Sequence, residues 1–220
     1  MVDLNADLGE IPGDLALMEV VTSANVACGG HAGDERTMAE AAAEAAARGV
    51  VIGAHPSYRD REGFGRIERG EEPSKVADEV AAQVKRLRRF AEVRYVKMHG
   101  ALYHRANTDE EMAAALLARL PVHHLLAQEG ALTRLARQAG FSVTLEGFCD
   151  RAYRPDGNLV PRGEPGAVLS EPAAVLAQAI RLSSSFGSLC LHGDTPGALE
   201  LARRVRAGLE EAGIGLSPFA

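Results

Sequence analysis

Cysteine is scarce in this chain of 220 residues, which has only Cys28, Cys149 and Cys190 and no CxxC pair. Three isolated cysteines provide neither the even set of a disulfide framework nor the paired thiolates of a structural zinc site. Free thiols are typical of proteins that stay in a reducing compartment. We therefore expect a cytoplasmic protein.

Membranes and nucleic acids are poor candidates as partners. The first residues, MVDLNADLGE, are acidic almost at once and lack the basic and apolar regions of a signal peptide. No later apolar run approaches the roughly 18 residues of a membrane-spanning helix. Lys and Arg total 24 against 30 Asp and Glu, so the formal net charge is −6, which disfavours a polyphosphate backbone. We expect no membrane segment and no nucleic-acid partner.

Several common motifs of nucleotide-binding proteins and hydrolases are also missing. The sequence has no GxxxxGK(S/T) loop, no HExxH and no GxSxG, and no GxGxxG follows a predicted strand. Any nucleotide site in this chain must therefore be of another kind.

A helix that ends at a glycine and is followed at once by a short apolar run occurs three times. The glycines are Gly49, Gly140 and Gly213, each where a left-handed C-cap is common. A helix, a C-cap glycine and a strand make up the second half of a repeating βα unit. The predicted helices cover residues 34–48, 131–139 and 196–212.

Signals for helix starts agree with this pattern. Thr108 and Glu111, three residues apart, match a capping box. Pro73 stands at the head of a predicted helix, and Thr195 followed by Pro196 predicts an N-cap with proline at the first helical position.

Strands alternate with the helices, which predicts a parallel sheet, either rolled into a barrel or left open. Runs such as VVIGA and SLCL are apolar at consecutive positions, as expected for strands covered on both sides. No linker rich in Pro, Gly or Ser divides the chain, so we expect one domain over residues 1–220. The predicted strands are residues 2–5, 20–27, 50–54, 93–98, 121–126, 141–145 and 188–191.

Polar residues suited to chemistry follow almost every predicted strand. Parallel strands share one carboxyl end, so residues far apart in sequence should meet there, where α/β folds bind and react. We predict catalytic roles for Asp7, His55, Lys97, His99, Glu146 and His192. We predict substrate- or nucleotide-binding roles for Asn5, Glu10, Asn25, His31, Asp150, Arg162 and Asp194.

Each of these residues also has a structural explanation. A single histidine after a strand often serves only as a hydrogen-bonded group, and Asp34 can simply cap a helix. The adjacent His123 and His124 point to opposite sides of a strand, so at most one can reach the site, and we expect His104 on a loop or at a helix start. Acids and histidines nevertheless recur at several strand ends on one face, and this favours a functional site, because unpaired buried charges are costly.

Lys97 is one of only three lysines in the chain. Side chains alternate along a strand, so Lys97 and His99 share one side. A lysine inside a barrel must pair with an acid such as Asp7 or Glu146, or its pKa must fall.

The segment GFCDRAYRPDGNLVPR is predicted to be a loop from its Pro, Asp-Gly and Asn content. Its Arg151, Arg154 and Arg162 are a candidate clamp for a carboxylate or a phosphate. The alternative is a solvated loop with surface salt bridges.

Six segments, in order along the chain, resemble the LamB/YcsF family, the A subunits of bacterial ATP-dependent 5-oxoprolinase. They are DLNADLGE, SANVACGGHAGD, GVVIGAHPSYRDREGFGR, VKMHGALYH, EGFCDRAYRPDGNLVPR and LCLHGDTPGAL. The resemblance implies a distorted (β/α)7 TIM-like barrel, similar to the barrels of polysaccharide deacetylases and glycoside hydrolases. It also implies ATP-driven opening of 5-oxoproline (pyroglutamate) to glutamate, together with separate B and C subunits.

The chain departs from the family pattern in places. Met98 stands where the family often has proline, and His104 where it often has asparagine. The segments before the fourth and seventh strands are short. None of these departures removes a strand-end acid or histidine, so the predicted site residues are unchanged.

The use of ATP that the resemblance implies suggests phosphorylation of the amide oxygen, which gives an electrophile that water attacks. On this hypothesis a carboxylate, Asp7 or Glu146, and a histidine act as base and acid. Lys97 and Arg162 neutralise an oxyanion or a phosphate. The candidate histidines are His55, His99 and His192.

Two other functions fit the same residues. An aspartate with two or three histidines is also a ligand set for a divalent metal, so a metal-dependent, deacetylase-like amide hydrolase is one alternative. A non-catalytic subunit that binds substrate for its partners is the other. The residues leave open whether ATP or a metal binds to this chain and whether it forms homo-oligomers.

Overall fold

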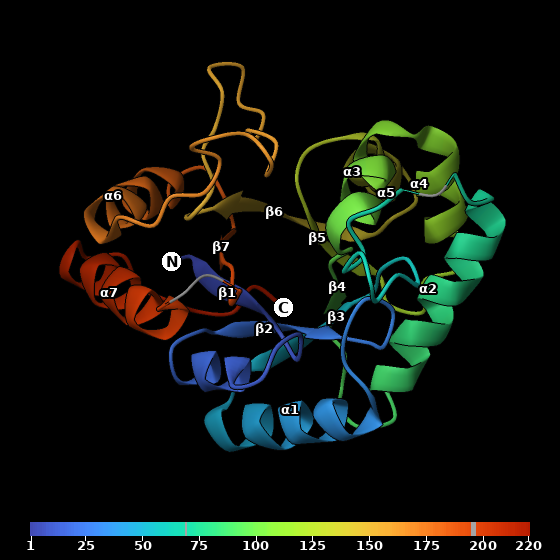
Figure 1. The fold of residues 1–220 in the computed structure, drawn as a ribbon, viewed down its shortest axis with the longest axis horizontal. Helices are drawn as coiled ribbons and strands as arrows, with labels where there is room; N and C mark the ends of the chain where they lie inside the picture. The colour runs from blue at the N-terminus through green and yellow to red at the C-terminus, as the bar shows by residue number, and fades with distance from the viewer. Residues whose placement is uncertain (69, 195–196) are drawn as a thin grey trace.

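Seven parallel strands close into a barrel in the computed structural model, which describes residues 1–68, 70–194 and 197–220 (Figure 1). Each strand pairs with the next along the chain, and β7 pairs with β1 to complete the ring. The closed ring confirms the (β/α)7 barrel and rules out the open sheet. The strands are β1 (Asp3–Leu8), β2 (Ser23–Ala27), β3 (Val51–His55), β4 (Tyr95–Val96), β5 (His124–Ala127), β6 (Ser142–Phe148) and β7 (Ser188–Leu191).

Helices lie around the outside of this ring (Figure 1). Most follow a strand and return the chain to the start of the next one, as parallel pairing requires. They are η1 (Asp14–Glu19, a 3-10 helix), α1 (Glu35–Arg48), α2 (Pro73–Leu87), α3 (Gly100–Thr108), α4 (Glu110–Leu117), α5 (Ala131–Gln138), α6 (Pro172–Leu182) and α7 (Ala198–Glu211). Among the described residues, none of the helices combines the length and apolar character needed to cross a lipid bilayer.

The ends of α1 follow the sequence signals closely. The Asp34 carboxylate accepts a hydrogen bond from the Thr37 N–H at 2.8 Å, and Gly49 ends the helix with φ = 70°. Pro73 is the first residue of α2, as predicted. The predicted cap at Thr195 and Pro196 lies outside the described residues.

The capping box predicted at Thr108 is wrong. Thr108 is the last residue of α3, and its hydroxyl donates to the His104 carbonyl at 3.1 Å. Asp109 caps α4 instead, accepting from the N–H groups of Glu111 and Met112 at 3.0 and 3.1 Å. Because a single residue separates the two helices, the hydroxyl at position 108 is taken up by the helix that is ending.

Four strands extend further toward their carboxyl ends than predicted, β3 and β5 by one residue and β1 and β6 by three. β1 continues to Leu8 and β6 to Phe148, so Asp7 and Glu146 lie on strands rather than after them. β4 is shorter than predicted: Tyr95 and Val96 pair with β3, and Val96 also pairs with β5. The chain nevertheless stays beside β3, since the Lys97 N–H donates to the Ala54 carbonyl.

The interior of the barrel is polar. Along β1, Asp3, Asn5 and Asp7 alternate with Leu4, Ala6 and Leu8, which belong to the hydrophobic core. Because successive side chains of a strand point to opposite faces, the acids and the amide point into the barrel and the apolar residues toward the helices. The interior therefore differs from the apolar filling expected from runs such as VVIGA.

Hydrogen bonds between strands connect the polar interior. Asn25 Nδ2 donates to Asn5 Oδ1 and to Asp7 Oδ1, each at 2.8 Å, and the Tyr95 hydroxyl donates to Asn25 Oδ1 at 2.7 Å. Residue 53 is necessarily glycine, because a Cβ there would lie 2.2 Å from the Tyr95 ring. A buried network that satisfies its members has few alternative arrangements, so it fixes the position of Asp7.

Candidate functional site

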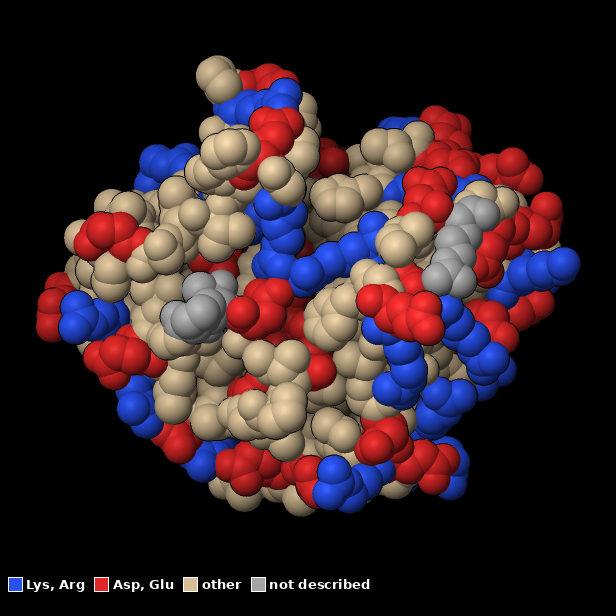
Figure 2. Space-filling model, in the orientation of Figure 1, with Lys and Arg blue, Asp and Glu red and all other residues tan. Residues whose placement is uncertain are grey.

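The carboxyl ends of the strands open into a cavity of about 570 Å³. Figure 2 shows this face of the molecule, on which basic and acidic side chains meet over a central hollow. Most of the predicted site residues line the cavity, as the convergence argument requires. They are Asp7, Glu10, His55, Lys97, His99, Arg162, His192 and Asp194.

The remaining predicted residues lie outside the lining. His31 contacts Glu10, Asp150 contacts His192, and Glu146 contacts Lys97. Asn25 contacts Asp7, and Asn5 contacts Asn25. These five therefore support lining residues instead of facing a bound molecule.

Lys97 lies between two acids at the bottom of the cavity. Its Nζ is 3.0 Å from Asp7 Oδ1 and 3.0 Å from Glu146 Oε2, and 3.2 Å from Cys190 Sγ. Burial alone would lower the pKa of Lys97, but Asp7 and the other neighbouring groups raise it well above its usual value. This confirms that Lys97 pairs with acids, and it keeps a positive charge on a side chain that is almost completely buried.

Asp7 is ionised for the same reason. Burial alone would raise the pKa of this carboxyl, but His55 and Lys97 outweigh it and hold the pKa well below the ordinary value. His55 Nε2 lies 3.4 Å from Asp7 Oδ2, and although burial opposes it, the Asp7 charge raises the pKa of His55. Asp7 is therefore a fixed negative charge and a weak base.

His192 is held by Asp150 at the other side of the cavity. Asp150 accepts from the His192 backbone N–H at 2.9 Å and lies 2.8 Å from ring atom Nδ1. The ring stacks on Phe148 with centroids 5.6 Å apart. Burial would raise the pKa of Asp150, but His192 lowers it, so the carboxylate is ionised. With Nδ1 bound to Asp150, Nε2 is the atom that the ring offers to a molecule in the cavity.

Two arginines share one carboxylate at the mouth of the cavity. Asp194 Oδ2 accepts from Arg66 at 2.8 Å and from Arg162 at 2.6 Å, and Arg162 also reaches Asp194 Oδ1 at 3.2 Å. Burial would raise the pKa of Asp194, but the two guanidinium groups lower it to about 2. The three residues come from the loops after β3, β6 and β7, so this contact joins separate parts of the rim.

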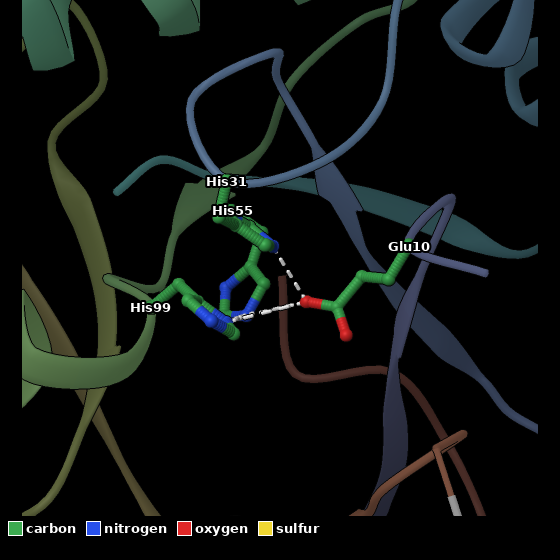
Figure 3. A group of neighbouring side chains, drawn as sticks. All are labelled: Glu10, His31, His55 and His99. Atoms are coloured by element: carbon green, nitrogen blue, oxygen red, sulfur yellow. Dashed lines mark hydrogen bonds and ion pairs between the residues drawn. The ribbon is translucent and has the colours of Figure 1, made fainter. Parts of the chain in front are cut away.

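Three histidines face the Glu10 carboxylate on the side of the cavity formed by β1 to β4 (Figure 3). Glu10 Oε1 lies 2.7 Å from His31 Nε2, 3.2 Å from His99 Nδ1 and 3.7 Å from His55 Nε2. Burial lowers the pKa of His31 to about 4 and also lowers the pKa of His99. This group has the composition of a metal-binding set. Asp7, Cys190 and His192 form a second set of potential ligand atoms, but there Asp7 and Cys190 already contact the charged Lys97.

The predicted arginine clamp is only partly formed. Arg154 pairs with Glu164 at 2.8 Å in its own loop and does not line the cavity. Arg151 lines the cavity but donates to the carbonyls of Val160 and Ala167, so it shapes the loop. Arg162 is the arginine of this segment that reaches the shared carboxylate.

Of the other three histidines, His104 lines the cavity and His123 and His124 do not. His104 lies within α3, past its first turn, and lines the cavity. His124 contacts Thr144 at 2.9 Å and packs against Phe219, and neither it nor His123 lines the cavity. The expectation that at most one of these two histidines reaches the site is met, since neither does.

Arg66 and Tyr103 line the cavity and are absent from the predicted set. Arg66 follows Phe64, the described non-glycine residue with a positive φ, 54°, and this turn returns the chain to the rim. The Gly- and Arg-rich segment GAHPSYRDREGFGR is the signal that could have indicated it. Tyr103 stands four residues after His99, and residues at this spacing lie on the same face of a helix.

A model of the LamB/YcsF family matches residues 2–220. The chain belongs to the LamB/YcsF family. A relative from Streptomyces avermitilis, named as the A subunit of 5-oxoprolinase, is 47% identical over 252 aligned positions, which cover all of both chains.

Solved structures share the fold of this chain. The crystal structure of a lactam utilization protein from Thermus thermophilus has a TM-score of 0.91 at 35% identity and covers 99% of each chain. The structure named T48 deacetylase with substrate has a TM-score of 0.53 at 11% identity, covering 98% of this chain and 86% of its own. The LamB/YcsF barrel thus shares its fold with a deacetylase.

Proposed function

We propose that this chain is the A subunit of an ATP-dependent 5-oxoprolinase and that it opens the lactam ring of 5-oxoproline to give glutamate. The observation that carries the proposal is similarity over the full length of both chains to relatives of that name. Those relatives are named as one part of a larger enzyme, which supports partners that we take to be B and C subunits. We take ATP to be the co-substrate and the cytoplasm to be the compartment.

The chemistry of a lactam explains what the site must do. An amide carbonyl is a poor electrophile, so the ring needs its oxygen activated and its leaving nitrogen protonated. Transfer of a phosphoryl group from ATP to that oxygen releases ADP. Water then adds to the carbon, the C–N bond breaks as nitrogen takes a proton, and a second water removes the phosphate to leave glutamate.

Two groups in the cavity suit these steps. Lys97, charged and buried, is placed to stabilise negative charge on the amide oxygen or a phosphate. His192, oriented by the ionised Asp150, is the better candidate for moving a proton, because Asp7 is too weak a base. Glu146 contacts Lys97 from below and positions it.

The rim suits an anion. Arg66 and Arg162 bind the Asp194 carboxylate, which has the shape and charge of the carboxylate of 5-oxoproline. We propose that these arginines bind the substrate carboxylate or a phosphate. A cavity of about 570 Å³ is large enough for both.

Reconstitution tests the proposal. The chain with B and C subunits should convert 5-oxoproline and ATP to glutamate and ADP, and the chain alone should not complete the coupled reaction. Asp7→Asn and His99→Gln, made singly, should abolish coupled turnover while the circular dichroism spectrum stays unchanged. Asp156→Asn, on the exposed part of the loop after β6, is the matched control. Full activity in both site variants would refute the assignment.

The histidine group around Glu10 favours one second candidate, a metal-dependent amide hydrolase. That enzyme would open 5-oxoproline or a related amide without ATP or partners when a divalent metal is supplied. A chain that binds 5-oxoproline in the reconstituted complex but whose site variants leave turnover unchanged would instead be a non-catalytic binding subunit.

A further inference from the structure

The geometry points to a divalent transition-metal site whose ligands are Glu10 Oε1, His31 Nε2, His55 Nε2 and His99 Nδ1. This inference does not depend on the proposed function, because it concerns what the chain binds and not what it converts. The four atoms all lie within 4.8 Å of one another (Figure 3).

Four of the six separations among these atoms are close to those of a tetrahedral ligand shell, and the other two are within 4.8 Å. Metal–ligand distances of about 2.0–2.1 Å place neighbouring ligand atoms about 3.3 Å apart. The separations from Glu10 Oε1 are 2.7, 3.2 and 3.7 Å, and His55 Nε2 lies 3.0 Å from His99 Nδ1. Small shifts of these side chains therefore accommodate a metal at the centre.

In each histidine, the ring nitrogen that points away from the group fixes the tautomer, and so decides whether the other nitrogen has a free lone pair. His55 Nδ1 lies 2.8 Å from the Lys97 carbonyl, and His99 Nε2 lies 2.8 Å from the Phe64 carbonyl. A carbonyl only accepts, so each of these nitrogens carries the proton. In the neutral rings, His55 Nε2 and His99 Nδ1 are therefore unprotonated, and their lone pairs face each other.

His31 is fixed by the same arrangement. Its Nδ1 lies 2.8 Å from Ser57 Oγ, and that hydroxyl donates its own hydrogen to the Tyr58 carbonyl. Ser57 must therefore accept from His31, which leaves Nε2 as a lone pair beside Glu10. Histidines that bind metals usually donate their second ring N–H in this way to an acceptor of the protein.

Without a cation this arrangement is unfavourable. Three lone pairs and a carboxylate oxygen converge in a site where His31, His55 and His99 are almost completely buried. One proton on His55 Nε2 would satisfy the contact with His99 Nδ1, but it would leave the His31 Nε2 lone pair against Glu10 Oε1. A second proton would bring imidazolium rings together, since the His31 and His99 rings stack with centroids 3.6 Å apart. One divalent ion satisfies all four atoms at once.

The backbone around the rings holds them in place. Phe64 adopts a left-handed φ of 54°, which costs energy for a residue with a Cβ, and its carbonyl contacts His99. Gly65 packs so closely that a Cβ there would lie 2.9 Å from His99 Cδ2 and 3.0 Å from His31 Cβ.

The ligand set selects the class of metal. Three imidazoles and one carboxylate suit Zn²⁺, Co²⁺, Mn²⁺ or Fe²⁺, whereas Mg²⁺ and Ca²⁺ prefer oxygen ligands. Glu10, His55 and His99 also line the cavity, so the ion would border the proposed substrate. Such an ion would supply a Lewis acid for a carbonyl or phosphoryl oxygen.

Metal binding to the full chain tests the inference. Protein purified without chelators is analysed for metals, then stripped and titrated with Zn²⁺ and Co²⁺, with calorimetry for stoichiometry and the visible Co²⁺ spectrum for geometry. We expect one tightly bound ion and a tetrahedral Co²⁺ spectrum. His31→Gln and His99→Gln should each weaken binding at least tenfold, and Ser57→Ala, which removes only an outer hydrogen bond, should weaken it less. His104→Gln, a histidine of the same cavity outside the group, should bind like the parent.

The outcomes separate cleanly. Folded parent protein that binds none of these ions in stoichiometric amount would overturn the inference, and so would affinities unchanged in both His31→Gln and His99→Gln. The parent titration remains decisive if a variant fails to fold. None of these measurements uses 5-oxoproline or ATP, so their result is independent of the reconstituted reaction.

Discussion

Lys97 and Asp7 form an ion pair inside the barrel, with 3.0 Å between Nζ and Oδ1 and both side chains almost completely buried. The two residues lie 90 positions apart in the chain. The barrel brings them together because β1 and the residue that follows β4 point their side chains into the same interior. Removing either partner leaves the other as a buried charge.

We expect Lys97→Met to destabilise the protein by about 3–5 kcal/mol, because Asp7 and Glu146 would lose their shared cation. Urea unfolding followed by circular dichroism measures the change. Lys75→Met, on the exposed face of α2, should cost less than about 0.5 kcal/mol. Similar stability of the two variants would show that Lys97 does not compensate the acids.

Asp150→Asn tests the orientation of His192. The variant keeps the size of the side chain but loses the charge that holds ring atom Nδ1. In the reconstituted complex kcat should fall about 10²–10⁴-fold, the range of general acid–base catalysis, with a smaller change in KM. Asp156→Asn, in the same loop but exposed, should leave kcat unchanged. An unaltered pH profile and kcat in Asp150→Asn would contradict this role.

Asp194 should make stability depend on pH in the acid range. Its pKa is about 2 in the folded protein and 3.8 ordinarily, so its contribution is fully present above about pH 4 and is lost as pH falls toward 2. The difference in unfolding free energy between the parent and Asp194→Asn should therefore be constant from pH 7 to 5 and shrink below pH 4. Urea unfolding at fixed pH values measures it, and a difference that grows on acidification would reverse the sign.

Gly65→Ala and Gly49→Ala form a matched pair. Both positions have a left-handed backbone, φ = 67° and 70°, so both variants incur about 1–2 kcal/mol of strain. Only at position 65 does the new methyl press on His99 and His31, whereas no atom lies within 4 Å of a Cβ at position 49. We expect Gly65→Ala to be less stable by about a further 1–3 kcal/mol and to lose activity, measured by thermal unfolding and turnover. Equal behaviour would mean that the histidines move aside at no cost.

Much of the fold could be predicted from local signals. The Gly49 C-cap, Pro73 and the alternation of helices and strands act over a few residues, and the structure follows them. The error at Thr108 is also local, since Asp109 is the stronger cap once the two helices are separated by one residue. Strand ends were less predictable, because β1 and β6 are extended by pairing with neighbours distant in sequence.

The site was predictable to the extent that a barrel fixes it. Asp7, Lys97 and His192 face the cavity because parallel strands end together. His31 and Asp150 contact lining residues without lining the cavity themselves. This depends on side-chain contacts, which the position of a residue after a strand does not predict. Arg66 reaches the rim through the turn at Phe64, a non-glycine residue whose positive φ no sequence pattern announces.

The polar interior of the barrel has a consequence for where the stability of the molecule resides. Because acids, amides and a lysine occupy much of the barrel interior, most hydrophobic contacts lie in a layer between the strands and the surrounding helices. Residues such as Leu4 and Leu8 belong to this layer, and truncating one of them to alanine removes about 2–5 kcal/mol. The hydrophobic layer around the barrel therefore stabilises the fold, which allows polar side chains to occupy the interior.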